Sequence, residues 1–525
     1  MAPAVAKKLT FMGVFTAAFA AFGGFLFGYD TGYISGVKEM QYWVNKFGTE
    51  QPDGTYLLSS GDNSLVTSIL SAGTFCGALL AFPAGDILGR RFGIIAFLCL
   101  FFIGVALQTA ANNLATFAVG RVFAGLGVGG TSCLVPMYQA EVAPKAIRGA
   151  IVADKYTWMI TIGLLVAAIV VNSTKNMNNA SSYQIPIGLQ FIWGAILVVG
   201  LVILPESPRW LLLKGRDEKA RKALSRVLQA DPDSQEVNEE LAEIAANIHH
   251  ERSLGNGGYI DCFRGGPGRN ALRTWTGIGL QALQQLTGIN FIFYYGTQFF
   301  KNSGISNPFV ITIATNVVNV GATVPGMWAV DKLGRRPLLL YGAAGMAVSQ
   351  LIVAIVGTAV PAGNQAAQKV LIAFVCIFIA HFAATWGPLA WVVTSEIYPT
   401  TTRGKQMSLS TASNWLLNFA IGYATPYLVD TTPGSAGLQS KVFFIWGGCC
   451  VLCFLFVFAV IPETKGLSLE QVDILYRNSS ILHSNKFRKQ IIAENMHDET
   501  RDAYNSVPKN TGTIDHKEKA DVEHL

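Results

Sequence analysis

The chain has 525 residues, of which 51% are hydrophobic and only 14% are charged, with a formal net charge of +6. Soluble domains have about a quarter of their residues charged, so this composition argues against a water-soluble globular protein. The runs 9–33, 151–171 and 442–461 are each long enough to cross a bilayer.

Apolar runs of about 20 residues recur along the chain and predict roughly twelve transmembrane helices. In the first half they are expected at 9–33, 63–84, 93–111, 114–137, 151–171 and 187–204. In the second half they are expected at 271–299, 308–330, 337–360, 369–395, 406–429 and 441–461. The fold class that follows is an all-α membrane protein with two groups of six helices.

The long polar stretch between the sixth and seventh runs divides the chain into regions. We expect a six-helix bundle over 1–204, a cytoplasmic linker with short helices over 205–270, a second six-helix bundle over 271–461 and a cytoplasmic, largely disordered tail over 462–525. The polar, charged composition of the last region is the reason for expecting disorder there.

Basic residues in the short loops predict the orientation. One side carries the arginine pairs Arg90–Arg91 and Arg335–Arg336, whereas the other carries only scattered lysines. Positive loops stay cytoplasmic, so we expect both termini inside, in a multi-pass protein of the plasma membrane. The sequons at Asn172 and Asn179 then lie outside, where a glycan could be added.

Three loop signals recur in order in the two halves, which indicates a duplicated six-helix unit. Asp86-Ile-Leu-Gly-Arg90 recurs after 245 residues, Glu141-Val-Ala-Pro after 255, and Pro205-Glu206 after 257. Transporters whose halves rock around a central site are built from such repeats.

The acidic and basic residues of these loops predict an inner charge network. Its expected members are Asp86, Arg90, Arg91, Glu141, Arg148, Asp331, Arg335, Arg336, Glu396 and Arg403. We expect charge-assisted bonds among them to latch the two halves together on the inner side. The alternative is that the arginines only fix the topology.

Taken together, the motifs resemble those of the sugar porter family of the major facilitator superfamily, and among its members the fungal hexose transporters. The motifs are Phe27-Gly-Tyr-Asp30-Thr-Gly, Gly120-Arg121, Pro205-Glu-Ser-Pro-Arg209, Gln284-Gln285-Leu-Thr-Gly-Ile-Asn290 and Pro462-Glu-Thr-Lys-Gly466. The resemblance covers the chain up to Lys465 and implies the major facilitator fold with monosaccharide transport, of glucose first and of xylose as a second substrate.

A sugar site needs amide side chains, which donate and accept hydrogen bonds, and an aromatic platform. The resemblance implies that sugar is bound by Phe27, Gln284, Gln285, Asn290, Asn319, Trp391 and Asn414. It also implies that Tyr294 and Tyr295 form an outer gate. Hydrogen bonding between helices is the alternative reading of the amides. The family usually has a glutamine where this chain has Thr157, so one sugar contact is expected to differ.

Asp30 and Arg121 are charges placed well inside expected spans, at depths that let them meet. An unpaired charge at mid-membrane costs about 2.5–3.5 kcal/mol on insertion scales, so we expect them to pair. The resemblance implies that this pair couples sugar to protons. The alternative is a structural ion pair in a facilitative uniporter.

Other classes are disfavoured by what the sequence carries. A transporter-like glucose sensor would share the fold and site, and remains the second alternative. A channel would need a continuous pore, and no Gly-x-x-x-x-Gly-Lys-Ser/Thr loop of an ATP-driven pump occurs. We expect no enzyme activity, no cofactor or metal and no nucleic-acid partner. The expected partners are a monosaccharide, protons and the lipid bilayer, with a monomer as the expected state.

Overall fold

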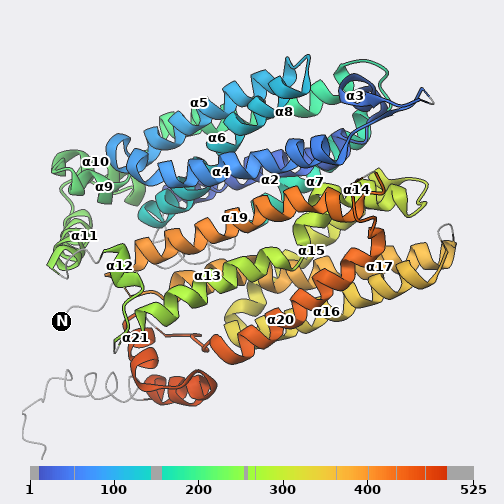
Figure 1. Cartoon of the computed structure of the whole chain (residues 1–525). Coiled ribbons are helices and arrows are strands. Elements are labelled where there is room, and N and C mark those ends of the chain that lie inside the picture. The colour runs from blue at the N-terminus through green and yellow to red at the C-terminus, as the bar shows by residue number, and fades with distance from the viewer. Residues whose placement is uncertain are drawn as a thin grey trace, which may run out of the picture.

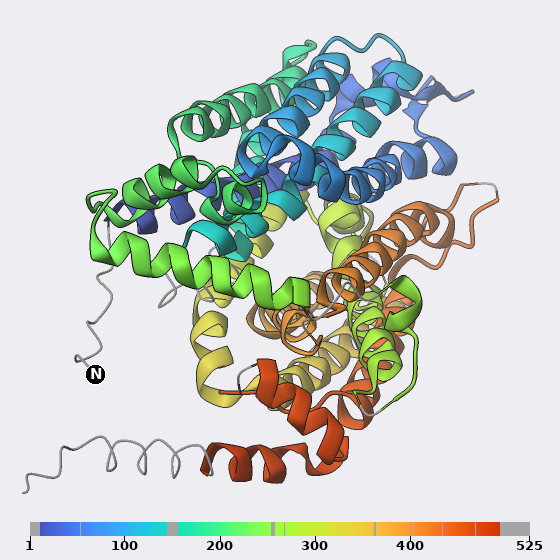
Figure 2. The ribbon, with the colours of Figure 1, turned by 90° about the vertical axis from the view of Figure 1, so that its left-hand side faces the viewer.

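The computed structural model describes residues 11–493 except 53, 144–155, 254–257, 267, 362–363, 400, 433 and 468. Helices make up nearly all of it, with one two-stranded hairpin, Thr49–Glu50 (β1) and Tyr56–Leu57 (β2). The helices lie in two groups side by side, coloured blue to teal and yellow to red in Figures 1 and 2.

The first group is formed by α1 to α8. Their bounds are Phe11–Ala20 (α1), Phe22–Val37 (α2), Gln41–Phe47 (α3), Ser60–Leu88 (α4), Arg90–Thr109 (α5), Leu114–Val142 (α6), Tyr156–Thr174 (α7) and Ser181–Ile203 (α8). The second group is formed by α13 to α20. Their bounds are Asn270–Leu286 (α13), Ile289–Asn302 (α14), Pro308–Leu333 (α15), Arg335–Ala359 (α16), Gln365–His381 (α17), Gly387–Glu396 (α18), Arg403–Val429 (α19) and Val442–Val460 (α20).

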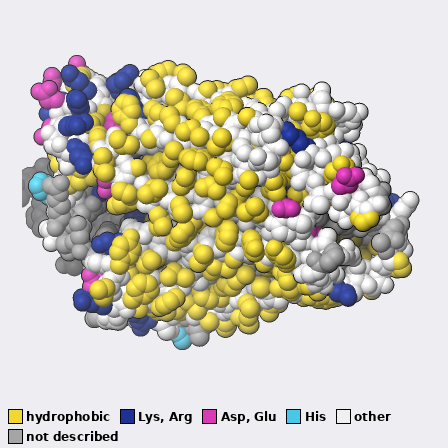
Figure 3. Space-filling view, turned by 45° about the horizontal axis from the view of Figure 1, so that its top comes forward, with side chains coloured by type: hydrophobic (Ala, Val, Ile, Leu, Met, Phe, Trp, Pro, Cys, Tyr) yellow, Lys and Arg dark blue, Asp and Glu magenta, His cyan; other side chains and the backbone are white. Residues whose placement is uncertain are grey.

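Ten helices of the described residues are long and apolar enough to cross a membrane. Two expected spans lie outside that set, each for a physical reason. The seventh is split by Gly288, whose φ of +80° breaks the helix into α13 and α14. The eleventh, α19, buries polar side chains such as Ser410, Asn414 and Asn418 along its length. Exposed apolar side chains cover the middle of the molecule in Figure 3, as a lipid-facing surface requires.

Short helices gather at one end of the molecule, which we call the α9 end (Figure 1). They are Pro208–Leu213 (α9), Asp217–Leu228 (α10), Gln235–Ser253 (α11) and Tyr259–Cys262 (α12). The opposite end carries α3 and the connection after α19, and we call it the α3 end.

The tail expected to be largely disordered is helical and packed where the structure describes it, which corrects that prediction up to residue 493. Leu469–Asn478 (α21) buries Val472, Leu475 and Tyr476. Asp473 of this helix lies 2.7 Å from the guanidinium of buried Arg273 at the base of α13. The apolar residues of α21 recur at helical spacing, so this segment can bury a face that a disordered tail would leave in water.

Polar contacts between the two groups of helices gather toward the α3 end. The pairs are Ser35–Thr297, Asn63–Gln298, Ser64–Tyr423 and Ser71–Asn418, with Lys38 over the ring of Tyr295. They join α2 and α4 of the first group to α14 and α19 of the second. The described structure is therefore closed between its halves at the α3 end.

Close packing of α2 on α7 depends on glycines. A Cβ added at Gly28 would lie 1.9 Å from the carbonyl oxygen of Ile160, and one at Gly163 would lie 2.2 Å from that of Phe25. Small residues at such crossings let helix backbones approach in a membrane. The same contact holds Asp30 of α2 at its place in the bundle.

We predict that Gly163→Ala lowers the unfolding temperature of the detergent-purified protein. The added methyl must push two backbones apart, and overpacking of this kind costs about 1–3 kcal/mol. Gly188→Ala is the matched control, because a Cβ at Gly188 has no atom within 4 Å. An equal or higher unfolding temperature for Gly163→Ala would refute the close contact.

Candidate functional site

The break at Gly288 brings amide side chains together. Gln284 and Gln285 lie in the last turn of α13, and Asn290 lies in the first turn of α14. All three side chains are buried. The left-handed glycine turns the chain between the two helices, so residues on either side of it face one space.

These amides form one hydrogen-bonded cluster with α19. The Nε2 of Gln285 donates to Oδ1 of Asn414 at 2.9 Å, and Nδ2 of Asn414 donates to Oε1 of Gln284 at 2.8 Å. Asn290 and Asn418 both donate to Oε1 of Gln285. The cluster thus satisfies amides that would be costly in an apolar bundle.

Two members of this cluster were not predicted. Gln281, one turn before Gln285, accepts from Nδ2 of Asn414 at 2.7 Å. Asn418, one turn after Asn414, accepts from Ser71 of α4 at 2.6 Å. The signal available in the sequence was helical spacing, since polar residues four apart on an expected span lie on one face.

Of the other predicted sugar residues, Phe27 is placed beside this cluster by a ring contact, and Asn319 and Trp391 are described by their burial. Phe27 of α2 packs edge-on against Trp415, with ring centroids 5.6 Å apart, next to Asn414. Asn319 is buried on α15 and Trp391 is half-buried on α18. Neither of these two side chains is hydrogen-bonded to the amide cluster within the described ranges. Thr157 lies half-buried in the first turn of α7.

Tyr294 and Tyr295, the two tyrosines predicted to form a gate, are buried and bonded to α19. Tyr294 donates to Oδ1 of Asn418 at 3.1 Å, and Tyr295 donates to the carbonyl of Gly422 at 2.7 Å. The Nζ of Lys38 lies 3.9 Å from the ring centroid of Tyr295, a cation–π contact from the other half. The tyrosines therefore sit where the halves meet at the α3 end.

Asp30 and Arg121 do meet, inside the first group of helices. Both side chains are fully buried, and Nη1 of Arg121 lies 4.0 Å from Oδ1 of Asp30. The Nε of Arg121 donates to the carbonyl of Val66 at 3.2 Å, and its Nη1 donates to the hydroxyl of Tyr33 at 3.0 Å. Among the described residues, neither oxygen of Asp30 has a hydrogen-bond partner.

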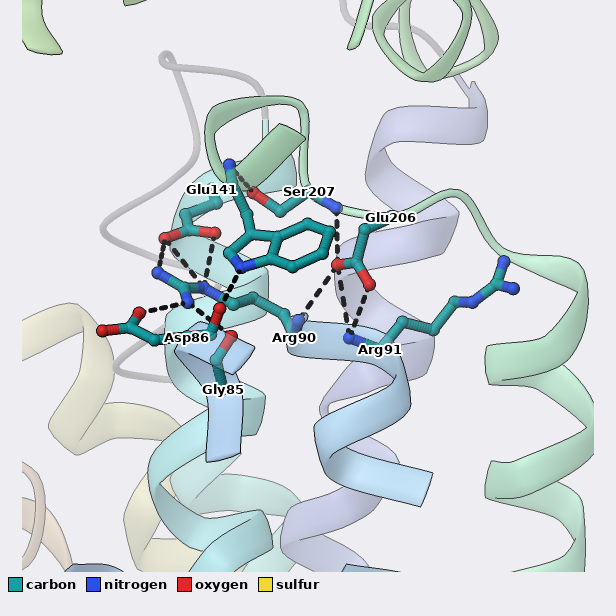
Figure 4. A network of polar contacts seen from close by, with 8 residues as sticks. Gly85, Asp86, Arg90, Arg91, Glu141, Glu206 and Ser207 are labelled. Carbon is teal, nitrogen blue, oxygen red and sulfur yellow. Dashed lines mark hydrogen bonds and ion pairs between the residues drawn. The ribbon is translucent and has the colours of Figure 1, made fainter. Parts of the chain in front are cut away.

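At the α9 end, Arg90 organises a charge network shown in Figure 4. Its Nη2 lies 3.1 Å from Glu141 and its Nη1 lies 3.0 Å from Asp86. Glu206 accepts the backbone N–H groups of Arg90 at 3.1 Å and Arg91 at 3.2 Å, and so caps α5. Burial raises the pKa of the Glu206 carboxyl above its ordinary value.

The second half repeats this arrangement. Arg335 lies 2.8 Å from Glu396, and Glu463 accepts the backbone N–H groups of Arg335 and Arg336 at 3.1 Å each. Thr464 donates to Glu396 at 2.7 Å. The duplication seen in the sequence therefore recurs in the hydrogen bonds.

In this structure, which is closed at the α3 end, the described contacts of Arg90 and Arg335 lie within each half, and the latch between the halves stays a prediction for the state that is closed at the α9 end. Arg90 contacts α4, α6 and the residue after α8, all in the first half, and the described partners of Arg335 lie in the second half. Arg403 begins α19 and is half-buried, whereas Arg148 lies outside the described residues, as does the side chain of Asp331. The spacing in sequence identified the residues but could not say which helices they join.

Glu206 and Glu463 are network members that the sequence reasoning left out. Both belong to the recurring Pro-Glu signal that follows the last helix of each half. Their recurrence at nearly the offset of the arginines was the signal that could have linked them. Each carboxylate joins the end of its half to the start of the third membrane span of that half, which is α5 for Glu206 and α16 for Glu463.

We predict that Arg335→Ala lowers the unfolding temperature of the purified protein, because it leaves Glu396 without its guanidinium at a cost of about 1–3 kcal/mol. Arg264→Ala is the control, since the Arg264–Asp261 pair is exposed and worth little. Equal unfolding temperatures for the two variants would show that the network adds no stability.

Comparisons with known proteins agree with this arrangement. The family model for sugar (and other) transporters matches residues 16–476. The major facilitator-type transporter ecdD of Aspergillus rugulosus is 56% identical over 88% of this chain and 87% of its own length. The probable glucose transporter rco-3 of Neurospora crassa is 46% identical over 92% of this chain and 83% of its own.

A sensor also appears among the similar proteins. The high glucose sensor RGT2 of Saccharomyces cerevisiae is 44% identical over 91% of this chain but only 63% of its own length. Among solved structures, the proton:xylose symporter XylE bound to 6-bromo-6-deoxy-D-glucose is 28% identical, with a TM-score of 0.72 over 88% of this chain and 99% of its own. The chain has the fold of the major facilitator superfamily, and it belongs to the family of sugar transporters.

Proposed function

We propose that this chain is a plasma-membrane transporter of monosaccharides that works by alternating access and proton symport, with glucose as first substrate and xylose as second. The observation that carries this proposal is a buried amide cluster of the second half that bonds Ser71 of the first half, together with a fully buried Asp30–Arg121 pair in the first half. The relative from Neurospora crassa supports glucose, and the XylE symporter supports proton coupling.

The amide cluster has the chemistry that a sugar needs. Each hydroxyl of a sugar both donates and accepts hydrogen bonds. Each amide side chain of the cluster does the same: Gln284, Gln285, Asn290 and Asn414. Sugar hydroxyls would exchange with bonds that the amides now make to one another, so the net gain depends on alignment rather than on bond number. Phe27 and Trp391 would supply apolar faces to the ring, and Asn319 a further amide.

Alternating access follows from where the halves touch. Contacts such as Ser71–Asn418 and Ser64–Tyr423 close the α3 end. With the positive loops of the α9 end in the cytoplasm, the α3 end faces outward and both termini lie inside. Opening to the outside would break these cross-half contacts, whereas the Arg90 and Arg335 networks lie within halves and would move with them.

Proton coupling would act through Tyr294, which bonds the amide cluster and lies within electrostatic reach of Arg121 and Asp30. Tyr294 donates to Asn418, which bonds both to Gln285 and to Ser71 of the first half. Protonation of Asp30 would release Arg121 from its only close carboxylate and change the charge facing Tyr294. The sugar site and the proton site could thus bias the same opening of the α3 end.

A glucose sensor is the second candidate, favoured by the likeness to RGT2. A sensor would bind sugar at the same amides and signal through its cytoplasmic segments. Accumulation of labelled sugar in cells that lack their own hexose transporters distinguishes the two, because a sensor accumulates none. We propose a monomer without cofactor, enzyme activity or nucleic-acid partner.

We predict that Gln285→Ala raises the half-saturating glucose concentration about fivefold to thirtyfold, for the loss of about 1–2 kcal/mol of hydrogen bonding. Gln368→Ala is the matched control, since that amide bonds only the Ser303 and Gly304 carbonyls near the α3 end. Uptake should be measured at equal surface expression. Unchanged half-saturation in Gln285→Ala would remove this cluster from the site.

We predict that Asp30→Asn abolishes uphill accumulation while sparing exchange of sugar at equal concentrations. Asparagine has the shape of a protonated aspartic acid but cannot ionise, so the pair with Arg121 cannot reform at each cycle. External alkalinisation during sugar uptake, with and without a protonophore, is the measurement. A wild-type protein that moves no protons and stops at equal concentrations would be a uniporter.

A further inference from the structure

Tyr33 is a buried residue of the first half that was not among the predicted site residues. It lies three residues after Asp30 on α2 and is fully buried. Its hydroxyl accepts a hydrogen bond from Nη1 of Arg121 at 3.0 Å and donates one to Oε1 of Gln108 at 2.5 Å. One uncharged hydroxyl thus joins the buried cation to α5.

The guanidinium lies nearer to this neutral hydroxyl than to the carboxylate. Nη1 of Arg121 is 3.0 Å from the Tyr33 oxygen and 4.0 Å from Oδ1 of Asp30. Its Nε donates to the carbonyl of Val66 rather than to Asp30. In the structure closed at the α3 end, Arg121 is therefore held by neutral acceptors, and Asp30 has a charged neighbour without a hydrogen bond from it.

The orientation of the hydroxyl is itself fixed. Nε2 of Gln108 donates to the carbonyl of Gly104 at 3.2 Å, which leaves its Oε1 to accept the phenol proton of Tyr33. With that proton committed to Gln108, the oxygen lone pairs of Tyr33 face Arg121. A buried cation is stabilised by such an acceptor when its carboxylate is neutralised.

The charged and titratable groups near Arg121 come from α2 with its C-terminal end and from α14. Asp30 and Tyr33 belong to α2, Tyr294 to α14 of the other half, and Lys38 follows the end of α2. Tyr29, one turn before Tyr33, bonds the carbonyl of Pro186 instead. Among these, Tyr33 alone is placed to accept from Arg121 in the described hydrogen bonds.

We propose that Tyr33 is a positioning residue for proton coupling, which receives Arg121 when Asp30 takes up its proton. The inference rests on the proposed proton symport. External water supplies the proton to the Asp30 carboxylate, the ion pair is lost, and Arg121 keeps a hydrogen bond through the Tyr33 oxygen. The energy of the protonated state falls, so Asp30 is protonated at a higher pH than an isolated ion pair would allow.

The test is Tyr33→Phe, which removes the hydroxyl and keeps the ring. Without that acceptor Arg121 turns to Asp30 and holds it ionised, so protonation needs more acid. At saturating glucose, the pH of half-maximal proton-driven uptake should fall by about one unit, the size of one hydrogen bond to a charge. The half-saturating sugar concentration for exchange at equal concentrations should stay at its wild-type value. A general distortion of the sugar site would change that value.

Tyr29→Phe is the matched control, because it removes a buried hydroxyl from the same helix without touching Arg121. It should keep the wild-type pH profile. Gln108→Met is the second variant, for use if Tyr33→Phe does not fold. It leaves the phenol proton undirected, and should shift the profile in the same direction by a smaller amount.

Each outcome decides the proposal. An acid shift in Tyr33→Phe or Gln108→Met, absent in Tyr29→Phe, supports it. A wild-type pH profile in Tyr33→Phe, or in Gln108→Met if only that variant folds, overturns the role of Tyr33. The proposed symport survives that result if Asp30→Asn still loses proton movement. If the wild-type protein itself moves no protons with sugar, the proposed symport fails, and the role of Tyr33 in coupling fails with it.

Discussion

A polar group inside an apolar bundle must find its partners within the protein, because lipid offers none. This constraint explains the arrangement of the three main polar clusters that the structure describes. The amides of α13, α14 and α19 bond one another, Arg121 is held by Tyr33, Val66 and Asp30, and Glu206 and Glu463 take the free N–H groups at the starts of α5 and α16. Each cluster lies where helices from distant parts of the sequence meet.

The clusters differ in whether they lie within one half or between the halves. Arg90 with Glu141, and Arg335 with Glu396, tie helices of the same half at the α9 end. The bonds of Ser71 and Tyr294 to Asn418 lie toward the other end, and Ser71 reaches across the halves. Bonds within a half keep it rigid, whereas bonds between halves must be exchanged when the protein opens. A rigid half can transmit a change at Asp30 to the junction without being deformed.

Apolar run length and loop charge were enough to predict a twelve-helix membrane fold with two repeated halves, because these signals come directly from the bilayer. Spacing along the helix was enough to predict that Gln285 and Asn290 lie together and that Asp30 reaches Arg121. It was not enough to predict that Tyr33 bonds Arg121 or that Asn418 bonds Ser71, since each contact depends on which helices are neighbours. Recurrence likewise singled out Arg90 and Glu141, but it could not show that the two join helices of the same half.

The duplication also gives a reason for the division of labour between the halves. Gly28 and Gly36 precede Gly288 and Gly296 by the same 260 residues, and that offset pairs Asp30 with Asn290. The same position of the repeated unit therefore bears a carboxylate in one half and an amide in the other. The carboxylate can exchange a proton, whereas the amide does not titrate and instead both donates and accepts hydrogen bonds. Asn290 belongs to the amide cluster that reaches the first half through Asn418 and Ser71, and Asp30 acts electrostatically on Tyr294, which bonds the same Asn418. Coupling of the proton to the sugar then needs no long path through the protein. It needs only that Asp30 and Asn290, the two versions of one repeated position, both affect the contact between Tyr294 and Asn418.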